Sequence, residues 1–336
     1  MRIEARAPTR IDLAGGTLDI WPLYLFHQPA VTLNCAISLY ASCTLEIERR
    51  NKAITLVSRD THRRERFSSY RALRAASRYR LPLLAHFVRF SAPSMGLTIT
   101  TDSQAPAGAG ISGSSALAVA LSAAFDRLLD WGKSREEWIH LSRDIEAIVL
   151  GVPTGTQDHY PAAFGGVSEV HLCPDKEFRV AARVNPRDLE KRLILCYTGK
   201  PRKSGINNWK VFKSQIEGNR RVSRNLEEIA NVACEMVAQI GRGKWNEVGR
   251  LMREEWSYRR RNLPTISTPT IDRIIASARR AGALGGKACG AGGGGCVALL
   301  IEPDARERVE AAVTNAGGQM LPIRIDRHGV RLRILR

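Results

Sequence analysis

The sequence contains no long apolar run. Nowhere in its 336 residues does an apolar stretch reach the roughly 20 residues that a membrane-spanning helix needs. The opening residues Met1-Arg-Ile-Glu4 are not followed by the apolar core of a secretory signal. We therefore expect a chain without membrane segments that works in the cytoplasm.

Cysteine and histidine are missing from the spacings that mark metal or redox sites. The seven cysteines stand singly, without a Cys-x-x-Cys pair. Their odd number argues against a disulfide framework, and their scatter argues against structural zinc. This usage predicts reduced thiols, which agrees with a cytoplasmic location.

Acidic residues are scarce relative to basic ones. The chain has 51 Lys and Arg against 33 Asp and Glu, which gives a formal net charge of +18. Such an excess is compatible with nucleic-acid binding or with attraction of small anionic substrates. Because most of the arginines are scattered along the chain, we do not favour nucleic acid as the main partner. The sequence is silent on oligomeric state.

What is present is the composition of a globular protein, with 44% apolar and 25% charged residues. Runs with strand-like alternation and runs with helical spacing follow one another without a regular strand–helix–strand repeat, which favours an α+β fold over a doubly wound sheet. Prolines and charges near 173–190 predict a boundary between domains 1–185 and 186–336. We also expect a loop at 282–295.

A loop rich in glycine and serine, Pro106 to Ala116, stands between a strand-like run and a long helical run. Glycine lets the backbone approach a phosphate closely, and a helix N-terminus supplies free N–H groups and the positive end of its dipole. A tight turn with a serine N-cap is the simpler alternative. The candidate phosphate-binding residues are Gly108, Gly110, Ser112, Gly113, Ser114 and Ser115.

The three glycines of this loop also satisfy the G-x-G-x-x-G spacing of dinucleotide-binding folds, with Asp126 or Asp130 near the place of the ribose-binding acid. The loop is not a Walker A motif, and the Gly132-Lys-Ser134 segment lacks the leading glycine. The loop alone therefore leaves open which phosphate compound it binds.

A second glycine cluster, 290–295, precedes a short apolar strand. Because glycine loses much backbone freedom on folding, such a cluster indicates close approach of a ligand or of another segment. Phosphoryl transfer needs carboxylates for Mg²⁺ and for the acceptor hydroxyl, and Glu146 on an expected helix and Asp158 in a loop are candidates. Taken alone, a loop aspartate such as Asp158 or Asp19 is more often a helix N-cap.

Three segments in this order resemble the three motifs of the GHMP kinase superfamily. They are Ala7-Pro-Thr-Arg-Ile-Asp-Leu-Ala-Gly-Gly16, Pro106-Ala-Gly-Ala-Gly-Ile-Ser-Gly-Ser-Ser-Ala-Leu117 and Cys289-Gly-Ala-Gly-Gly-Gly-Gly-Cys296. The first of them, extended to Asp19, is similar to the sugar-kinase branch that includes D-glycero-D-manno-heptose 7-phosphate kinase. The segments Gly165-Gly166, Tyr197-Thr-Gly199 and Gly285-Gly-Lys287 also match that branch.

The resemblance implies a two-domain α+β fold, with an N-terminal ribosomal protein S5 domain 2-like domain, a C-terminal ferredoxin-like α/β domain and the active site between them. It implies ATP and Mg²⁺ as cofactors. By the same resemblance Asp158 is the catalytic aspartate, Arg10 is the cation near the transferred phosphate, and Ser115 and Glu146 hold the metal. The loop residues named above surround the ATP phosphates, and the substrate-binding residues are Asp19, Gly15, Gly16, Gly292 and Gly293.

The chain departs from the branch in its substrate-facing first motif, where Thr17 and Leu18 replace a glycine and a threonine, and in the loop, where Ser112 replaces a glycine. We expect an ATP-dependent kinase acting on a sugar or sugar phosphate, with a heptose 7-phosphate as the best candidate. Cations that suit a phosphate on the acceptor, or that simply face solvent, are Lys200, Arg202, Lys203 and Arg259 to Arg261.

Three other functions stay open at this point. One is a GHMP kinase for a non-sugar alcohol such as a mevalonate-type acid. The second is a dinucleotide-binding oxidoreductase, which rests on the glycine spacing alone and leaves the second glycine cluster unexplained. The third is a basic RNA-binding protein, although the chain lacks the aromatic signature of common RNA-binding domains.

Overall fold

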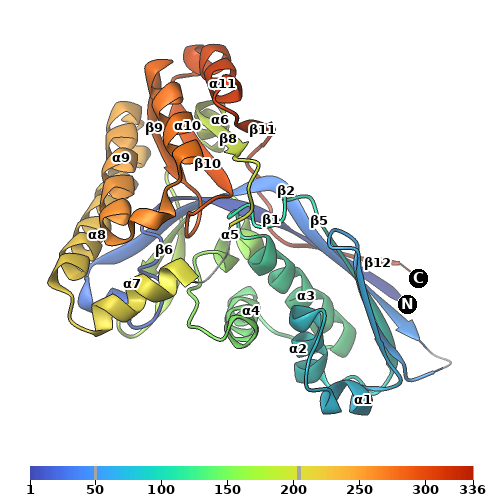
Figure 1. The fold of residues 1–336 in the computed structure, drawn as a ribbon. Helices are drawn as coiled ribbons and strands as arrows, with labels where there is room; N and C mark the ends of the chain where they lie inside the picture. Colours follow the sequence, from blue (N-terminus) through green and yellow to red (C-terminus); the bar gives the residue numbers. More distant parts are fainter. Residues whose placement is uncertain (49–50, 203–205, 336) are drawn as a thin grey trace.

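The computed structural model describes residues 1–48, 51–202 and 206–335. Two antiparallel-rich sheets lie one above the other, each with helices packed on it (Figure 1). This arrangement confirms the α+β class. Within the described ranges, no helix is both long and apolar enough to cross a membrane.

The larger sheet has eight strands in the order β12-β1-β2-β5-β3-β4, with β6 and β7 attached to the other end of β2. Most pairs are antiparallel, and β3 runs parallel to β5. The strands are β1 (Arg2–Ala14), β2 (Ala30–Glu48), β3 (Ile54–Ser58), β4 (Arg63–Phe67), β5 (Gly96–Ser103), β6 (Val167–Leu172), β7 (Glu177–Ala181) and β12 (Arg331–Leu335).

The long strand β2 organises this sheet. Its first part, 30–35, pairs with β6, and its last part, 41–48, pairs with β5, while β1 runs along most of its other edge. Apolar residues of β1 and β2, such as Ile3 and Leu45, face a core formed with the helices below the sheet. A register shift between Pro8 and Thr9 precedes the part of β1 whose residues Ile11 and Leu13 join a second core.

The helices below the larger sheet come from the first half of the chain (Figure 1). Helix α3 begins at Gly113, within the glycine–serine segment, and packs against β1 and β2 through a run of buried small residues. Helix α4 starts with a capping box between Ser134 and Glu137, as a helix after a polar turn often does. These helices are α1 (Tyr70–Ala75), α2 (Pro82–Ser91), α3 (Gly113–Leu129), α4 (Arg135–Leu150) and α5 (His159–Phe164).

The smaller sheet has four antiparallel strands in the order β11-β8-β10-β9. Alternate residues of β8 and β10 enter different cores: Leu195 and Ala298 face one core, and Ile194 and Val297 face the other. Apolar side chains on both faces explain why these strands read as continuous apolar runs. The strands are β8 (Leu193–Tyr197), β9 (Ala283–Ala288), β10 (Cys296–Ile301) and β11 (Gln319–Leu321).

Helices cover both faces of the smaller sheet. Helices α8 and α9 pack on the face that shares a core with β1 and β2, and α10 and α11 pack on the other face. Strand β12 returns to pair with β1. The division of the chain after residue 185 stays a prediction. The remaining helices are α6 (Pro186–Arg192), α7 (Ile206–Ile216), α8 (Arg220–Gly241), α9 (Trp245–Asn262), α10 (Pro269–Arg280) and α11 (Arg306–Asn315), with short 3-10 turns η1 (Leu23–Phe26), η2 (Pro264–Ile266) and η3 (Pro303–Ala305).

The prediction of a loop at 282–295 is wrong for the first half of this range, because residues 283–288 form β9. The glycines that suggested a loop are needed for close packing instead. A Cβ on Gly285 would lie 2.6 Å from the carbonyl oxygen of Gly249 on α9. Glycine inside a strand often marks such a close approach of another backbone.

Candidate active site

A cavity of about 420 Å³ opens beside the N-terminus of α3, within the range of roughly 300–1,000 Å³ that is common for small-molecule sites. Its walls come from the glycine–serine loop, the segment before α5, and Arg202, Arg259, Gly290 and Ala291 from the second half of the chain. All six predicted phosphate-binding residues line this cavity, and Arg10, Glu146 and Asp158 line the same space.

The glycine–serine loop is held in conformations that favour glycine. Gly108 and Gly110 have φ values of +67° and +79°. A Cβ on Gly110 would lie 2.9 Å from Nε of Arg202, and a Cβ on Gly108 would lie 2.9 Å from the Arg202 backbone nitrogen. The loop thus needs glycine both for its backbone angles and for the approach of residues 201–202.

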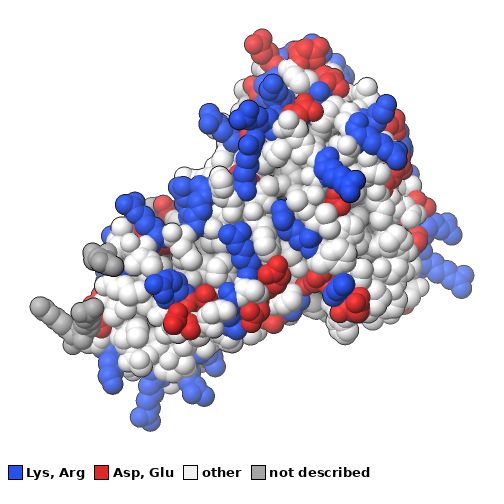
Figure 2. Space-filling view, turned by 180° about the vertical axis from the view of Figure 1, so that it is seen from behind, with Lys and Arg blue, Asp and Glu red and all other residues white. Residues whose placement is uncertain are grey.

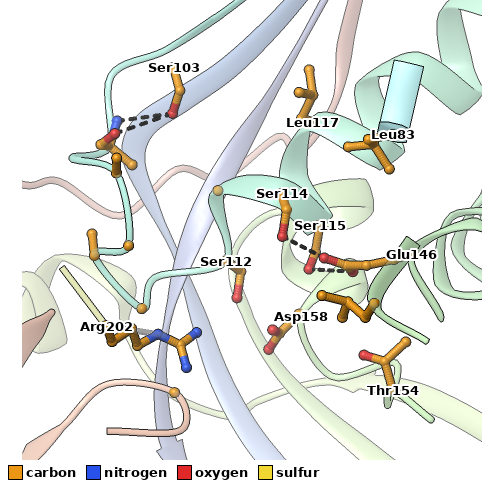
Figure 3. Close-up of a pocket in the computed structure, with 18 of the residues that line it drawn as sticks. Leu83, Ser103, Ser112, Ser114, Ser115, Leu117, Glu146, Thr154, Asp158 and Arg202 are labelled. Carbon is orange, nitrogen blue, oxygen red and sulfur yellow. Dashed lines mark hydrogen bonds between the residues drawn. The ribbon is translucent and has the colours of Figure 1, made fainter. Parts of the chain in front are cut away.

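Ser112 occupies the N-cap position of α3 with a left-handed φ of +63°. Its side chain does not cap the helix, and its Oγ is buried without a hydrogen-bond partner among the described residues. Figure 3 shows this hydroxyl directed into the space that Asp158 also faces. An uncapped helix N-terminus with a free hydroxyl beside it suits an anionic ligand.

Ser114 and Ser115, at the start of α3, both contact Glu146 on α4 (Figure 3). Ser114 Oγ donates to Oε1 at 2.5 Å and Ser115 Oγ donates to Oε2 at 2.9 Å. Nε2 of His159 lies 3.1 Å from Oε2 of Glu146. Burial opposes ionisation of Glu146, but the hydrogen bond and charge of His159, together with both serine hydroxyls, outweigh it and lower the pKa of Glu146.

Glu146 and the two serines form an all-oxygen donor set at the cavity wall. No group of three or more His, Cys, Asp or Glu side chains in the described ranges could enclose a metal ion. Mg²⁺ is usually held by one or two carboxylates together with substrate phosphates rather than by a protein cage. A single carboxylate with hydroxyls beside a phosphate-type loop fits that mode of binding.

Arg10 and Asp158 form a close ion pair across the cavity floor. Nε and Nη2 of Arg10 donate to Oδ1 of Asp158 at 2.8 and 2.5 Å, and Nη1 donates to the carbonyl oxygen of Gly110 at 3.0 Å. Burial opposes the charge of Arg10, but Asp158 and Asp12 outweigh it and raise the pKa of Arg10 further. Asp158 precedes α5, yet its side chain makes no capping hydrogen bond, so its carboxylate is used toward the cavity.

The residues predicted to bind the acceptor lie mostly behind the cavity surface. Oδ2 of the buried Asp19 accepts a hydrogen bond from the Gln157 backbone at 3.0 Å, and burial, reinforced by the charge of Asp158, raises the pKa of Asp19 to about 7. Gly15 packs under Val31, and Gly16 lies beside Arg259 and Gln157. Of the described residues, those that line the cavity do not include Asp19, Gly15, Gly16, Gly292 or Gly293.

The second glycine cluster packs against the first loop. A Cβ on Gly290 would lie 2.8 Å from the carbonyl oxygen of Gly110, and one on Gly295 would lie 2.5 Å from that of Ala109. The backbone N–H of Cys296 also donates to the carbonyl oxygen of Ala109 at 2.7 Å. Contact with another segment therefore explains this cluster, and its first two residues still reach the cavity.

The predicted cations lie in different places. Arg202 lines the cavity, burial lowers its pKa, and its Nε has no hydrogen-bond partner in the described part of the chain. Arg259 lines the cavity and is paired with Asp12. Arg260 and Arg261 are exposed beside a different groove, and Lys203 lies outside the described residues.

Sequence reasoning missed three charged residues next to this cavity. Asp12, Glu255 and Lys287 are all buried, as is Arg259, which the sequence suggested as a surface or phosphate-binding cation. One signal was available: Asp12 stands between Ile11 and Leu13 in an apolar strand. A charge in such a strand is rarely buried without a partner.

Two of the open alternatives are not supported by the architecture. After α3 the chain enters α4 rather than a parallel strand, so the glycine loop does not belong to a strand–helix–strand dinucleotide unit. Figure 2 shows Lys and Arg scattered over the rear face with Asp and Glu between them, so that this face has the pattern of a solvated surface.

Comparison with known proteins gave two family models and many relatives. The models for the GHMP kinases N terminal domain and GHMP kinases C terminal match residues 71–166 and 236–319. The D-glycero-alpha-D-manno-heptose 7-phosphate kinase of Campylobacter jejuni is 28% identical over 98% of each chain. The mevalonate kinase of Thermococcus onnurineus is 30% identical over 70% of this chain and 69% of its own.

A solved structure has the same fold over nearly the whole chain. The D-glycero-D-manno-heptose 1-phosphate kinase from Bacteroides thetaiotaomicron superposes with a TM-score of 0.77 and 24% identity, covering 99% of each chain. At that identity the likeness concerns the fold. Both sheets and the helices between them therefore have a known precedent.

Proposed function

The chain belongs to the GHMP kinases, a family of ATP-dependent phosphotransferases with alcohol acceptors, and from this premise we propose that it transfers the γ-phosphoryl group of ATP to a hydroxyl of a sugar or sugar phosphate. The observation that carries the proposal is the convergence of Asp158, Arg10 and the glycine–serine loop on one cavity. Phosphoryl transfer needs positioning and charge stabilisation more than covalent chemistry from the protein.

In this proposal the N-terminus of α3 and the loop before it bind the ATP phosphates. Backbone N–H groups at Gly113 and Ser114 and the free hydroxyl of Ser112 are preorganised donors, which stabilise charge better than water does. Glu146 and Ser115 hold Mg²⁺, which neutralises charge on the phosphates when bound. Arg202, whose Nε lacks a partner among the described residues, is the cation available for a phosphate on the acceptor.

Asp158 faces the acceptor hydroxyl in this proposal. Its carboxylate is held in one orientation by Arg10. It accepts a hydrogen bond from the O–H of the acceptor hydroxyl as the hydroxyl oxygen approaches the γ-phosphorus. Positioning of this kind supplies a large part of the rate enhancement in bimolecular reactions. Arg10 in turn stabilises the negative charge of Asp158 and of the phosphoryl group in transfer.

The best candidate acceptor is a heptose 7-phosphate or a related sugar. It is supported by the Campylobacter jejuni relative, which aligns over 98% of each chain. The second candidate is a mevalonate-type acid, because relatives from Thermococcus onnurineus and other archaea are mevalonate kinases at up to 30% identity. Those relatives align over a smaller part of the chain, and we therefore favour the sugar.

A coupled ADP-release assay tests the proposal with heptose 7-phosphate, free hexoses, mevalonate and homoserine as acceptors. We expect turnover with a sugar or sugar phosphate, and a fall in kcat of roughly 100-fold or more in Asp158→Asn. The exposed Asp175→Asn is the matched control and keeps full activity. Turnover with mevalonate alone would support the second candidate, and an active Asp158→Asn enzyme would overturn the mechanism.

A further inference from the structure

Behind the cavity wall lies a cluster of five buried charges, which we call the ion cluster: Arg10, Asp12, Glu255, Arg259 and Lys287. Their side chains are at most 7% exposed. Arg10 and Asp12 stand two residues apart on β1 and so share one face of the strand. Glu255 and Arg259 are one turn apart on α9, and Lys287 comes from β9.

Asp12 is the centre of the cluster. Its Oδ2 lies 3.0 Å from Nζ of Lys287 and 3.2 Å from Nη1 of Arg259. Its Oδ1 accepts a hydrogen bond from the Gly290 backbone at 2.9 Å and lies 3.6 Å from Nη1 of Arg10. Burial opposes the charge of Asp12, but Lys287, Arg10 and Arg259 outweigh it and keep the pKa of Asp12 far below its usual range.

The cluster contacts cavity residues from both halves of the chain. Through Arg10 it reaches Asp158, and through Gly290 it reaches the turn that packs on the glycine–serine loop. The carbonyl oxygen of Gly290 accepts from Nη2 of Arg259 at 2.6 Å, while its N–H donates to Asp12. Both backbone polar groups of this one residue are therefore bound by the cluster.

Stability alone does not account for these charges. Taking ions out of water costs several kcal/mol per ion, and well-packed apolar residues of similar size often serve a core as well or better. Lys287 is fully buried and its closest partner is Oε2 of Glu255 at 2.5 Å. Oε1 of Glu255 lies 3.7 Å from Nη1 of Arg259 but has no hydrogen-bond partner in the described ranges, so this buried ion lacks part of the hydrogen bonding that offsets the cost of burial.

We propose that Asp12, Lys287 and Glu255 are positioning residues that fix Arg10 and the Gly290 turn against each other at the cavity wall, and that the rate of phosphoryl transfer depends on them. Lys287 and Glu255 act through Asp12. Asp12 does not line the cavity, but it contacts both Arg10 and the Gly290 N–H. This inference rests on the proposed function for its effect on rate. The geometry it invokes can be measured without any acceptor.

The double variant Lys287→Met with Glu255→Leu removes one cation and one anion together and leaves apolar side chains of similar length. We expect it to fold with a Tm within a few degrees of the parent. We expect kcat to fall at least 10-fold while KM for ATP changes less than 3-fold, because no residue of the glycine–serine loop is changed whereas Arg10 and the Gly290 turn are held less firmly. Hydrogen exchange at residues 289–296 becomes faster.

The matched control is Arg250→Met with Glu254→Leu, an ion pair on the exposed side of the same helix. It removes the same kinds of charge and leaves kcat and the exchange of 289–296 unchanged. The single variant Asp12→Asn keeps the shape of the side chain. If the double variant does not fold, kcat and the hydrogen exchange of 289–296 are measured on this single variant. It is expected to lower kcat at least 10-fold.

A folded double variant with kcat within 2-fold of the parent and unchanged exchange at 289–296 would overturn the proposal. The outcome is separable from that of the proposed function. A parent protein that releases no ADP with any acceptor refutes the proposed function, and the exchange measurement then still decides whether the ion cluster holds the Gly290 turn.

Discussion

At the scale of single residues, Asp19 links the first motif to the segment that carries Asp158. Its carboxylate is buried against that segment: a Cβ on Gly155 would lie 1.8 Å from Oδ2, and the Gln157 N–H donates to the same oxygen. The family resemblance assigns Asp19 to the acceptor. That role stays a prediction, and in this structure the contacts of Asp19 hold the segment before α5.

The titration of Asp19 gives a pH-dependent stability. Burial, and after it the charge of Asp158, raises the pKa of Asp19 to about 7, whereas an unfolded aspartate titrates at about 4. Between these values the folded state binds the extra proton, so the free energy of unfolding falls as pH rises, by about 1.4 kcal/mol per pH unit at most. Above pH 7 the loss is complete.

The variant Asp19→Asn removes this titration and keeps an oxygen for the Gln157 N–H. Relative to the parent, its Tm is expected to rise as pH goes from 5 to 8, with most of the change below pH 7. Thermal unfolding at four pH values measures it, with the exposed Asp175→Asn as the control for loss of a charge. A Tm difference that stays constant over this range contradicts the prediction.

Single residues also mark how far the sequence could be interpreted. Arg10, Glu146 and Asp158 were named from motifs, and they line one cavity. Asp12 lies in the same motif as Arg10, and Lys287 lies in the matched segment Gly285-Gly-Lys287, but neither residue has a role that the sequence alone predicts. Their meaning depends on a contact between β1 and β9, and no local pattern in either segment predicts which distant charge it will meet.

At the scale of elements, the contact between α9 and β9 depends on glycine. A Cβ on Gly249 would lie 2.5 Å from Cβ of Leu284 and 2.8 Å from its carbonyl oxygen. Alanine in a helix interior normally gains up to about 1 kcal/mol over glycine, but here it forces the helix away from the strand. Overpacking of this kind usually costs about 1–3 kcal/mol.

We therefore expect Gly249→Ala to lower the free energy of unfolding by about 1–3 kcal/mol, as measured by urea denaturation. Gly241→Ala, at the end of α8, is the control, because its nearest neighbour would be at an ordinary 3.6 Å. It is expected to be neutral or stabilising. Equal stability of the two variants would show that α9 can shift freely on β9.

Elements with a clear period were predictable and those fixed by tertiary contacts were not. The alternation in residues 2–13 and the helical spacing in 135–149 correspond to β1 and α4. Strand β4 reads Arg-Arg-Glu-Arg-Phe and has no apolar alternation, because it lies at the edge of the sheet. Strand β9 looked like a loop because its glycines serve a neighbour that the local sequence does not reveal.

At the scale of the whole molecule, the two proposed domains share their cores. The core below the larger sheet includes Val222, Leu226, Ile229 and Ala230 of α8, and β12 completes the edge beside β1. We propose that 1–185 and 186–336 are parts of one folding unit. Removing the second part exposes apolar residues and leaves Asp12 without its buried partners Arg259 and Lys287.

A fragment of residues 1–185 is accordingly expected to show no cooperative urea transition by circular dichroism. Mixing it with the fragment 186–336 is expected to restore such a transition, since the missing core residues are then supplied. The intact chain is the reference. A cooperative transition in 1–185 alone would mean that the larger sheet does not need α8 or β12.

The ion cluster also has a consequence for how the protein is made. Ribosomes release β1 first, and Arg259, the partner of Asp12, follows 247 residues later. Domains tend to fold in the order of synthesis, yet Asp12 gains its partners Arg259 and Lys287 only after α9 and β9 have emerged. A chain terminated before β9 is thus unable to complete the ion cluster.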